Sequence, residues 1–228
     1  MAQFDFAAYR DRIADMVERH LAEPGGIAAV RAAMAQVQAW AEQTLAREIS
    51  EQQRRELACG PGCAHCCRVT VTVLIPEALA IAAHLRDSFG PEGAERWRLT
   101  LGETARAVRW MDDADRVRAD IPCPFLDEKN HCVIHPLRPL TCRALTSTDP
   151  ARCRSALDAL ASGREEPLLT NLFQKFLMEM TFRGIADGLE RRGLDTMGRE
   201  LCRAVAHSLE SPTLVNEFLA GRRTLFPE

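Results

Sequence analysis

The chain has 228 residues, of which 46% are hydrophobic and 27% are charged. This composition is typical of a soluble globular protein, and the length is sufficient to bury a proper core. A net charge of −3 and an isoelectric point near 6.1 disfavour a general nucleic-acid binder, because such proteins are usually basic.

No apolar run approaches the roughly 18 residues that a membrane-spanning helix needs. The start, "MAQFDFAAYRDR", lacks the basic and apolar regions of a signal peptide. We therefore expect a cytoplasmic protein with no membrane partner. Cytosolic thiols are normally reduced, and the nine cysteines are an odd number, so structural disulfides are disfavoured.

Residues 1–57 are predicted to form an N-terminal helical hairpin. Apolar residues recur at near-helical intervals over 4–22, and "EPGG" at 23–26 interrupts the pattern. A stretch rich in Ala, Gln and Glu follows from residue 27 to about 57, and it consists largely of strong helix formers.

Residues 58–155 carry most of the cysteines. The stretch "CGPGCAHCC" at 59–67 ends the preceding helix, and "RVTVTVLI" alternates as a short strand does. Helices are predicted from Pro76 to about Ser88 and over 91–118. Residues 120–155 hold four cysteines and five prolines with little periodicity, so this part is expected to be loop-rich.

Residues 156–228 are predicted to be C-terminal helices, with one strongly apolar face. That face comprises Leu168, Leu172, Phe173, Phe176, Leu177, Met180 and Ile185. The three tryptophans, Trp40, Trp97 and Trp110, are expected to be core anchors. The predicted fold is a mainly α single domain over 1–228, with a loop-rich cysteine metal-binding centre and at most one short strand pair.

The distribution of the cysteines indicates a metal site. Eight of the nine lie between residues 59 and 153, whereas Cys202 falls on a predicted helix and is interpreted as an ordinary buried thiol. The spacing Cys63-x-x-Cys66 lets both sulfurs reach one ion, and a site of four thiolates then needs a second pair. The candidates for that pair are Cys123, Cys132, Cys142 and Cys153.

The adjacent Cys66 and Cys67 favour more than one metal atom, because neighbouring side chains usually diverge. Eight sulfurs also match two sites of four ligands, so a two-centre or multinuclear site is predicted. Arginines adjacent to the cysteines could offset the negative charge or bind an anionic ligand. They are Arg68, Arg138, Arg143, Arg152 and Arg154.

These motifs together resemble the YkgJ-type cysteine-cluster family, which is described as a domain expected to chelate zinc or iron. The resemblance rests on "CGPGCAHCC", "PEALAIAAHL", "CPFL", "HCVIHPLRPLTCR" and "STDPARC", over residues 59–153. The family is related to part of the flagellin lysine N-methylases. Two departures are a first gap of three residues, where the family has two, and His135 at a position where an aromatic residue is common.

The resemblance implies a set of metal ligands by position. They are Cys59, Cys63, Cys66, Cys67, Cys123, Cys132, Cys142 and Cys153. Arg138 and Arg143 follow as candidates to contact a cofactor or an anion beside these ligands.

Two other interpretations of the first cysteines are disfavoured. The spacing Cys59-x3-Cys63-x2-Cys66 is that of radical S-adenosylmethionine enzymes, but a long predicted helix precedes it and only one strand is indicated. A thioredoxin-like Cys63-x-x-Cys66 would need a βαβ pattern, which is missing. S-adenosylmethionine is therefore a disfavoured cofactor.

The function predicted from sequence is metal binding, with the metal ion as the partner. Zinc and an iron–sulfur cluster both stay open, because cysteine ligands suit either. So do three roles: a structural or trafficking metal protein, an iron–sulfur enzyme related to lysine N-methylation, and a redox sensor or electron carrier. His65, His131 and His135 lie near the cysteines and are secondary ligand candidates. No protein partner can be assigned.

Overall fold

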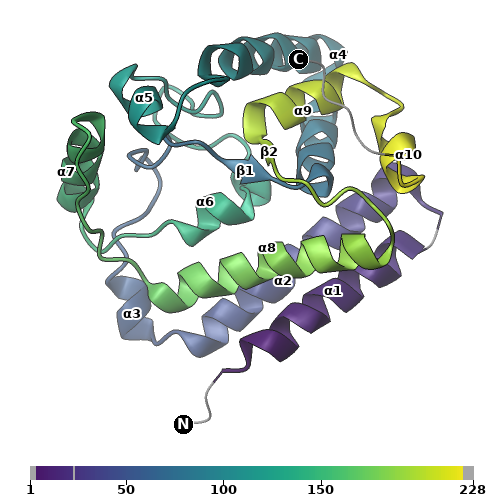
Figure 1. The fold of residues 1–228 in the computed structure, drawn as a ribbon, viewed down its shortest axis with the longest axis horizontal. Coiled ribbons are helices and arrows are strands. Elements are labelled where there is room, and N and C mark those ends of the chain that lie inside the picture. The colour runs from purple at the N-terminus through teal and green to yellow at the C-terminus, as the bar shows by residue number, and fades with distance from the viewer. Residues whose placement is uncertain (1–3, 23, 223–228) are drawn as a thin grey trace.

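The structure, a computed structural model, describes residues 4–22 and 24–222. Within these ranges the chain forms ten α-helices and one two-stranded antiparallel sheet. The mainly α fold class predicted from the sequence is confirmed. Two groups of helices stand on opposite sides of the molecule, and the cysteine-bearing loops lie at one end between them (Figure 1).

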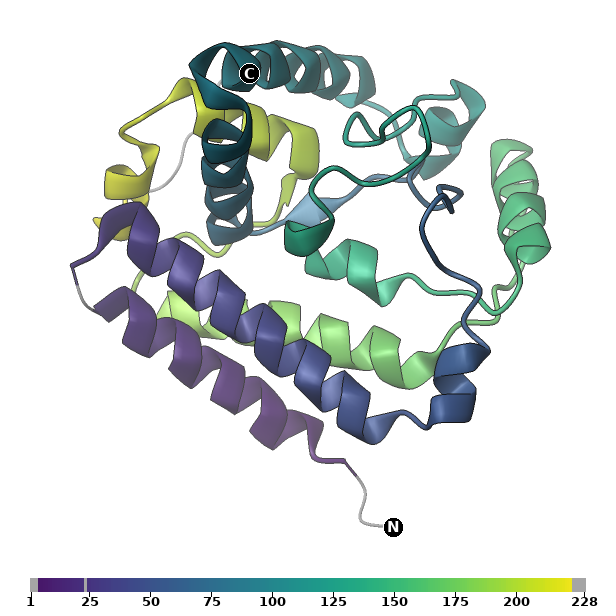
Figure 2. The same cartoon turned by 180° about the vertical axis from the view of Figure 1, so that it is seen from behind.

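The first group consists of α1 (Phe6–Ala22), α2 (Gly26–Glu48) and α8 (Leu172–Arg191), which lie side by side (Figure 2). Their apolar stripes form one core, and α10 (Leu214–Leu219) packs against α2. The helix expected to run on to about residue 57 ends at Glu48. Ser50 and Gln53 form a capping box there and start the separate α3 (Glu51–Arg55).

The contact between α1 and α8 depends on two glycines of α8. A Cβ at Gly184 would lie 2.7 Å from the carbonyl oxygen of Arg10, and one at Gly188 would lie 2.6 Å from that of Ala14. The two backbones therefore approach more closely than any side chain allows. A buried hydrogen bond of 2.7 Å between Tyr9 and Thr181 joins the same helices.

The second group is α4 (Ile75–Val108) with α9 (Leu201–Glu210). Gly90 has a φ of 65° and precedes Pro91, which divides α4 at the point where the sequence predicts two helices. The second half ends at Val108 instead of 118. Asp112 then caps a short α5 (Asp113–Arg118) by accepting the amide N–H of Asp115 at 2.7 Å.

Only two residues of the predicted strand form β1 (Thr72–Val73), which pairs with β2 (Arg199–Glu200). The partner is short because α9 begins at Leu201, whose N–H still bonds to the oxygen of Val71 at 2.8 Å. This small sheet holds the starts of α4 and α9 beside each other.

The segment between α5 and α8 contains η1 (His135–Leu137), α6 (Leu140–Ala144) and α7 (Pro150–Ala161). In both views α6 lies between the two helix groups, and α7 lies at the edge next to α5 (Figures 1 and 2). No helix in the described part of the chain is both long and apolar enough to cross a membrane.

Two expectations about buried apolar residues are wrong. Trp110 is 84% exposed, because α4 ends before it and its ring packs on Arg109. In α8 and the segment before it, Leu168, Leu172 and Phe176 are exposed, whereas Leu177 and Ile185 are in the core. Only part of the predicted apolar face is therefore buried.

The close packing of α8 on α1 predicts that Gly188→Ala destabilises the protein. The added methyl group would meet backbone, which cannot move aside, and overpacking of this kind costs about 1–3 kcal/mol. Gly102→Ala in α4 is the matched control, since a Cβ there meets nothing within 4 Å and Ala stabilises a helix by up to about 1 kcal/mol relative to Gly. Denaturant unfolding should move the two midpoints in opposite directions, and equal shifts would contradict the packing argument.

Candidate metal centre

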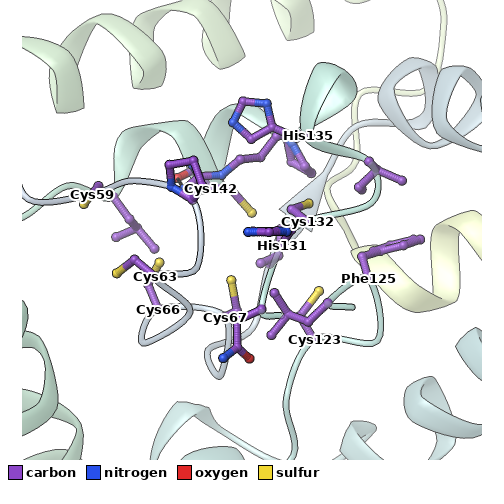
Figure 3. Close-up of a pocket in the computed structure, with 18 of the residues that line it drawn as sticks. Cys59, Cys63, Cys66, Cys67, Cys123, Phe125, His131, Cys132, His135 and Cys142 are labelled. Carbon is purple, nitrogen blue, oxygen red and sulfur yellow. Dashed lines mark hydrogen bonds between the residues drawn. The ribbon is translucent and has the colours of Figure 1, made fainter. Parts of the chain in front are cut away.

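A cavity of about 570 Å³ lies between the loop that follows α3 and the segment from residue 123 to α6. Seven of the eight predicted ligands line it, namely Cys59, Cys63, Cys66, Cys67, Cys123, Cys132 and Cys142 (Figure 3). Apolar side chains, among them Val71, Phe125 and Ile134, form the rest of its wall. Seven cysteines from residues 59–142 are thus gathered around one space, and Cys153 is not among them.

The first cysteine loop is folded by consecutive turns. The N–H of Cys63 bonds to the oxygen of Gly60 at 3.0 Å, and the N–H of Cys67 bonds to that of Ala64 at 3.1 Å. Gly62 has a φ of 84°, which a residue with a side chain rarely adopts. The thiols of Cys66 and Cys67 hydrogen-bond to each other, and this bond and burial raise the pKa of Cys66.

Cys123 and Cys132 lie on a small hairpin. A bridge pairs Leu126 with Cys132, and the N–H of Val133 bonds to the oxygen of Phe125 at 2.9 Å. At the tip, the side chain of Asp127 accepts the N–H groups of Lys129 and His131. The N–H of Cys123 bonds to the oxygen of Cys67 at 2.7 Å, so the hairpin is joined to the first loop.

Cys142 comes from α6 and is among the most enclosed of the eight thiols. Burial raises its pKa to about 12, and burial likewise raises the pKa of Cys123 to about 11. In both cases a positive side chain opposes the shift, Arg138 beside Cys142 and Arg116 beside Cys123. Buried thiols of this kind stay protonated at neutral pH until a cation favours the thiolate.

Cys153 is the one predicted ligand that does not line the cavity, and it lies in the first turns of α7. Burial is the main cause that raises the pKa of the Cys59 thiol. Cys63 and Cys66 raise this pKa further, and so, to a smaller extent, does Cys153, which is therefore within electrostatic reach of Cys59. Ser147 connects the two segments, since its N–H bonds to the Cys59 sulfur at 3.3 Å and its oxygen accepts the N–H of Ala58 at 2.9 Å.

Within the described residues, no three His, Cys, Asp or Glu side chains are grouped closely enough to hold a metal ion as they stand. The sulfurs surround a space, and the segments that carry them are mostly loops and turns. As a donor set, buried thiols fit zinc and iron–sulfur chemistry.

The two predicted arginines have different environments. Arg138 lines the cavity, donates to the oxygen of Cys142, and lowers the pKa of Cys66, Cys132 and Cys142. Arg143 does not line the cavity, and its guanidinium donates to carbonyl oxygens and pairs with Glu42. The oxygens are those of His135, Pro136 and Arg138, at 3.4, 3.1 and 2.7 Å. The role of Arg143 beside a cofactor stays a prediction.

The histidines and the remaining arginines also differ. His131 and His135 line the cavity, while His65 does not. Arg68 pairs with Asp120, and Arg152 pairs with Glu166, so both have carboxylate partners.

Glu77 is a contributor to the site that sequence reasoning missed. Its buried carboxylate accepts the N–H of Leu74 at 3.0 Å and that of Leu140 at 3.1 Å, so one side chain caps the starts of α4 and α6. Burial raises its pKa to about 7. A glutamate near the start of a predicted helix was the available signal, but nothing local indicates the partner in α6. Arg116, which is only 2% exposed and lowers the pKa of Cys123, was also missed, because no local pattern indicates that it is buried near this thiol.

Comparison with known proteins gives one match. Residues 58–159 match the model of the family described as "CxxCxxCC: Putative zinc- or iron-chelating domain". The matched segment contains all eight predicted ligands and leaves Cys202 outside. No curated protein and no solved structure matches the chain significantly.

The contacts of Arg143 predict that Arg143→Lys destabilises the protein by about 1.5–3 kcal/mol. Lysine keeps the charge but cannot reach three carbonyl oxygens at once, and hydrogen bonds to charged groups contribute amounts of this order. Arg152→Lys is the control, because this half-exposed residue should shift the free energy of unfolding by about 0.5 kcal/mol at most. Thermal unfolding compares the two, and an unchanged Arg143→Lys protein would contradict the assignment.

Proposed function

We propose that the protein binds zinc or iron through its cysteine thiolates, because residues 58–159 match the family model described as "CxxCxxCC: Putative zinc- or iron-chelating domain". The observation that carries the proposal is the gathering of seven predicted ligands around one cavity. Thiols that were only core residues would not be expected to line the same cavity. Cys202, buried in α9, is the contrasting case.

The chemistry of the cavity wall supports a soft or borderline metal. Among the described lining residues there is no Asp or Glu, and the possible ligands are seven cysteines, His131 and His135. Magnesium and calcium prefer oxygen ligands, whereas zinc and iron–sulfur clusters take thiolates. The eight predicted ligands would hold the metal, and Arg138 would offset part of the negative charge of the thiolates.

A bound zinc ion would supply a structural cross-link, and an iron–sulfur cluster would add electron transfer. Either way the thiols lose protons on binding, so part of the binding free energy is folding free energy. The loop segments that carry most of the cysteines, which have few helical turns of their own, would gain most from it.

A second candidate is an enzyme, which the position of Arg138 favours. Arg138, His131 and His135 line the same cavity as the sulfurs, so an anionic molecule held by the guanidinium would lie beside the metal. Iron–sulfur chemistry with S-adenosylmethionine, as the relation to lysine N-methylases implies, belongs to this candidate. A redox sensor or electron carrier is the third, and it requires a reducible cluster.

Anaerobic purification followed by metal analysis, sulfide analysis and a visible spectrum tests the proposal. A colourless protein with zinc identifies a zinc site, and a brown protein with iron and acid-labile sulfide identifies a cluster. The proposal is wrong if protein without metal, and with all nine thiols reduced, has the same fold and stability as the protein loaded with zinc or iron.

Replacing single cysteines gives a sharper prediction. Cys142→Ala removes a cavity thiol and should lower the bound metal and the solubility. Cys202→Ala is the matched control, because Cys202 is 1% exposed within α9 and should keep the full metal content with a stability loss of about 1 kcal/mol. Metal analysis of both purified variants checks this, and an equal loss of metal would contradict the division of the cysteines.

A further inference from the structure

Large apolar side chains are exposed mainly around the start of α8 and the end of α6. Nine such side chains are exposed in the part of the chain that the structure describes, and five gather here, namely Leu145, Leu168, Leu169, Leu172 and Phe176. Thr146 joins the two segments, because its hydroxyl bonds to that of Thr170 at 2.9 Å and accepts the N–H of Asn171 at 3.1 Å. Grouped exposure of this kind is typical of a binding surface, whereas single exposed apolar residues are ordinary.

A groove of about 260 Å³ follows this apolar group, between α6 and α8. Its lining residues on α8 are Lys175, Met178, Glu179, Phe182 and Arg183, and those from α6 and its end are Leu140, Thr141, Ala144 and Leu145. Leu172 is 60% exposed and precedes Lys175 by three positions, so it projects from the same side of α8. Figure 1 shows α6 on one side of α8 and α1 on the other, with the outer face of α8 toward the viewer. This outer face thus carries a projecting leucine at one end and a groove at the other.

Two charges in the middle of the outer face make it complementary to itself. The Nζ of Lys175 and the Oε1 of Glu179 are 4.0 Å apart, and their side chains are 47% and 37% exposed, so this pair contributes little within one chain. In an antiparallel pair of α8 helices with a two-fold axis at the level of Leu177, Lys175 of each copy lies opposite Glu179 of the other. The same axis places Leu172 of each copy opposite Phe182, at the groove of the other. Shape and charge therefore select the same arrangement.

We propose that the protein forms a two-fold symmetric homodimer through the outer faces of α8. Leu172 of each copy fills the groove between α6 and α8 of the other, and two pairs of Lys175 with Glu179 form across the interface. The proposal goes beyond metal binding, since no predicted metal ligand lines the groove. Leu145 lines both the groove and the cysteine cavity, so the second copy lies beside one wall of the candidate metal centre.

Sedimentation equilibrium of the full chain tests the proposal, under anaerobic and reducing conditions that prevent dimers linked by disulfides. The wild-type chain should have twice the 25.4 kDa mass of one copy. Leu172→Glu should raise the dissociation constant of the dimer by at least about tenfold, because a charge replaces the apolar contact in the groove. An acidic residue suits the first turn of α8, so circular dichroism should show an unchanged fold.

Leu99→Glu is the matched control, because Leu99 is a half-exposed leucine of α4 that does not line the groove. It should leave the dissociation constant unchanged. A wild-type chain that is monomeric, or a dimer that Leu172→Glu and Leu99→Glu weaken equally, would overturn the proposal.

Charge reversal tests the position of the two-fold axis. Lys175→Glu places two glutamates opposite each other at both contacts, and Glu179→Lys places two lysines there, so each variant should be largely monomeric alone. An equimolar mixture of the two should dimerise, because every glutamate then lies opposite a lysine of the other copy. Repulsion within one helix cannot produce this recovery, since each chain keeps its like charges. Single variants that still dimerise alone, or a mixture that stays monomeric, would overturn the arrangement.

Discussion

The cysteine-bearing part of the molecule depends on polar contacts that join α6 to both helical groups. Glu77 caps α4 and α6 with one buried carboxylate, and Arg143, one turn further along α6, donates to the carbonyl oxygens of His135, Pro136 and Arg138. The two side chains are close enough for Arg143 to lower the pKa of Glu77 against the effect of burial. Gln174 of α8 then binds the oxygen of Arg143 at 2.9 Å. The position of Cys142 in the cavity is therefore set by both helical groups.

The cysteine thiols can be buried at only a small cost in folding free energy. A buried thiol is a small apolar group while it is protonated, and burial keeps it so by raising its pKa. Arginines stand at the points where charge would develop, Arg138 within the cavity and Arg116 behind Cys123. The molecule can therefore fold with neutral thiols and has compensating charge in place for thiolates.

Patterns within the chain predicted most of the helices, since helical periodicity and turn residues are local signals, and the spacing of the cysteines singled out seven that line one cavity. They could not predict contacts between distant segments. β2 is invisible in the sequence because two residues make no strand pattern, and the partner of Glu77 lies in a different helix. The link between the first cysteine loop and the hairpin depends on the bond from the N–H of Cys123 to the oxygen of Cys67, which no spacing rule indicates. Trp110 was misjudged because an apolar residue just past a helix end has no buried face to join.

The long separation of Cys59 and Cys153 in the sequence has a consequence for the unfolded chain. All the other predicted ligands lie between Cys59 and Cys153 in the sequence, so an ion bound by both would close a loop that contains them. Closing so long a loop removes conformational entropy from the unfolded ensemble, as a disulfide between distant residues does. Unlike a disulfide, this closure would be opened by acid or a chelator without any change in redox state. The stability of the whole middle segment would then follow the supply of metal in the cell.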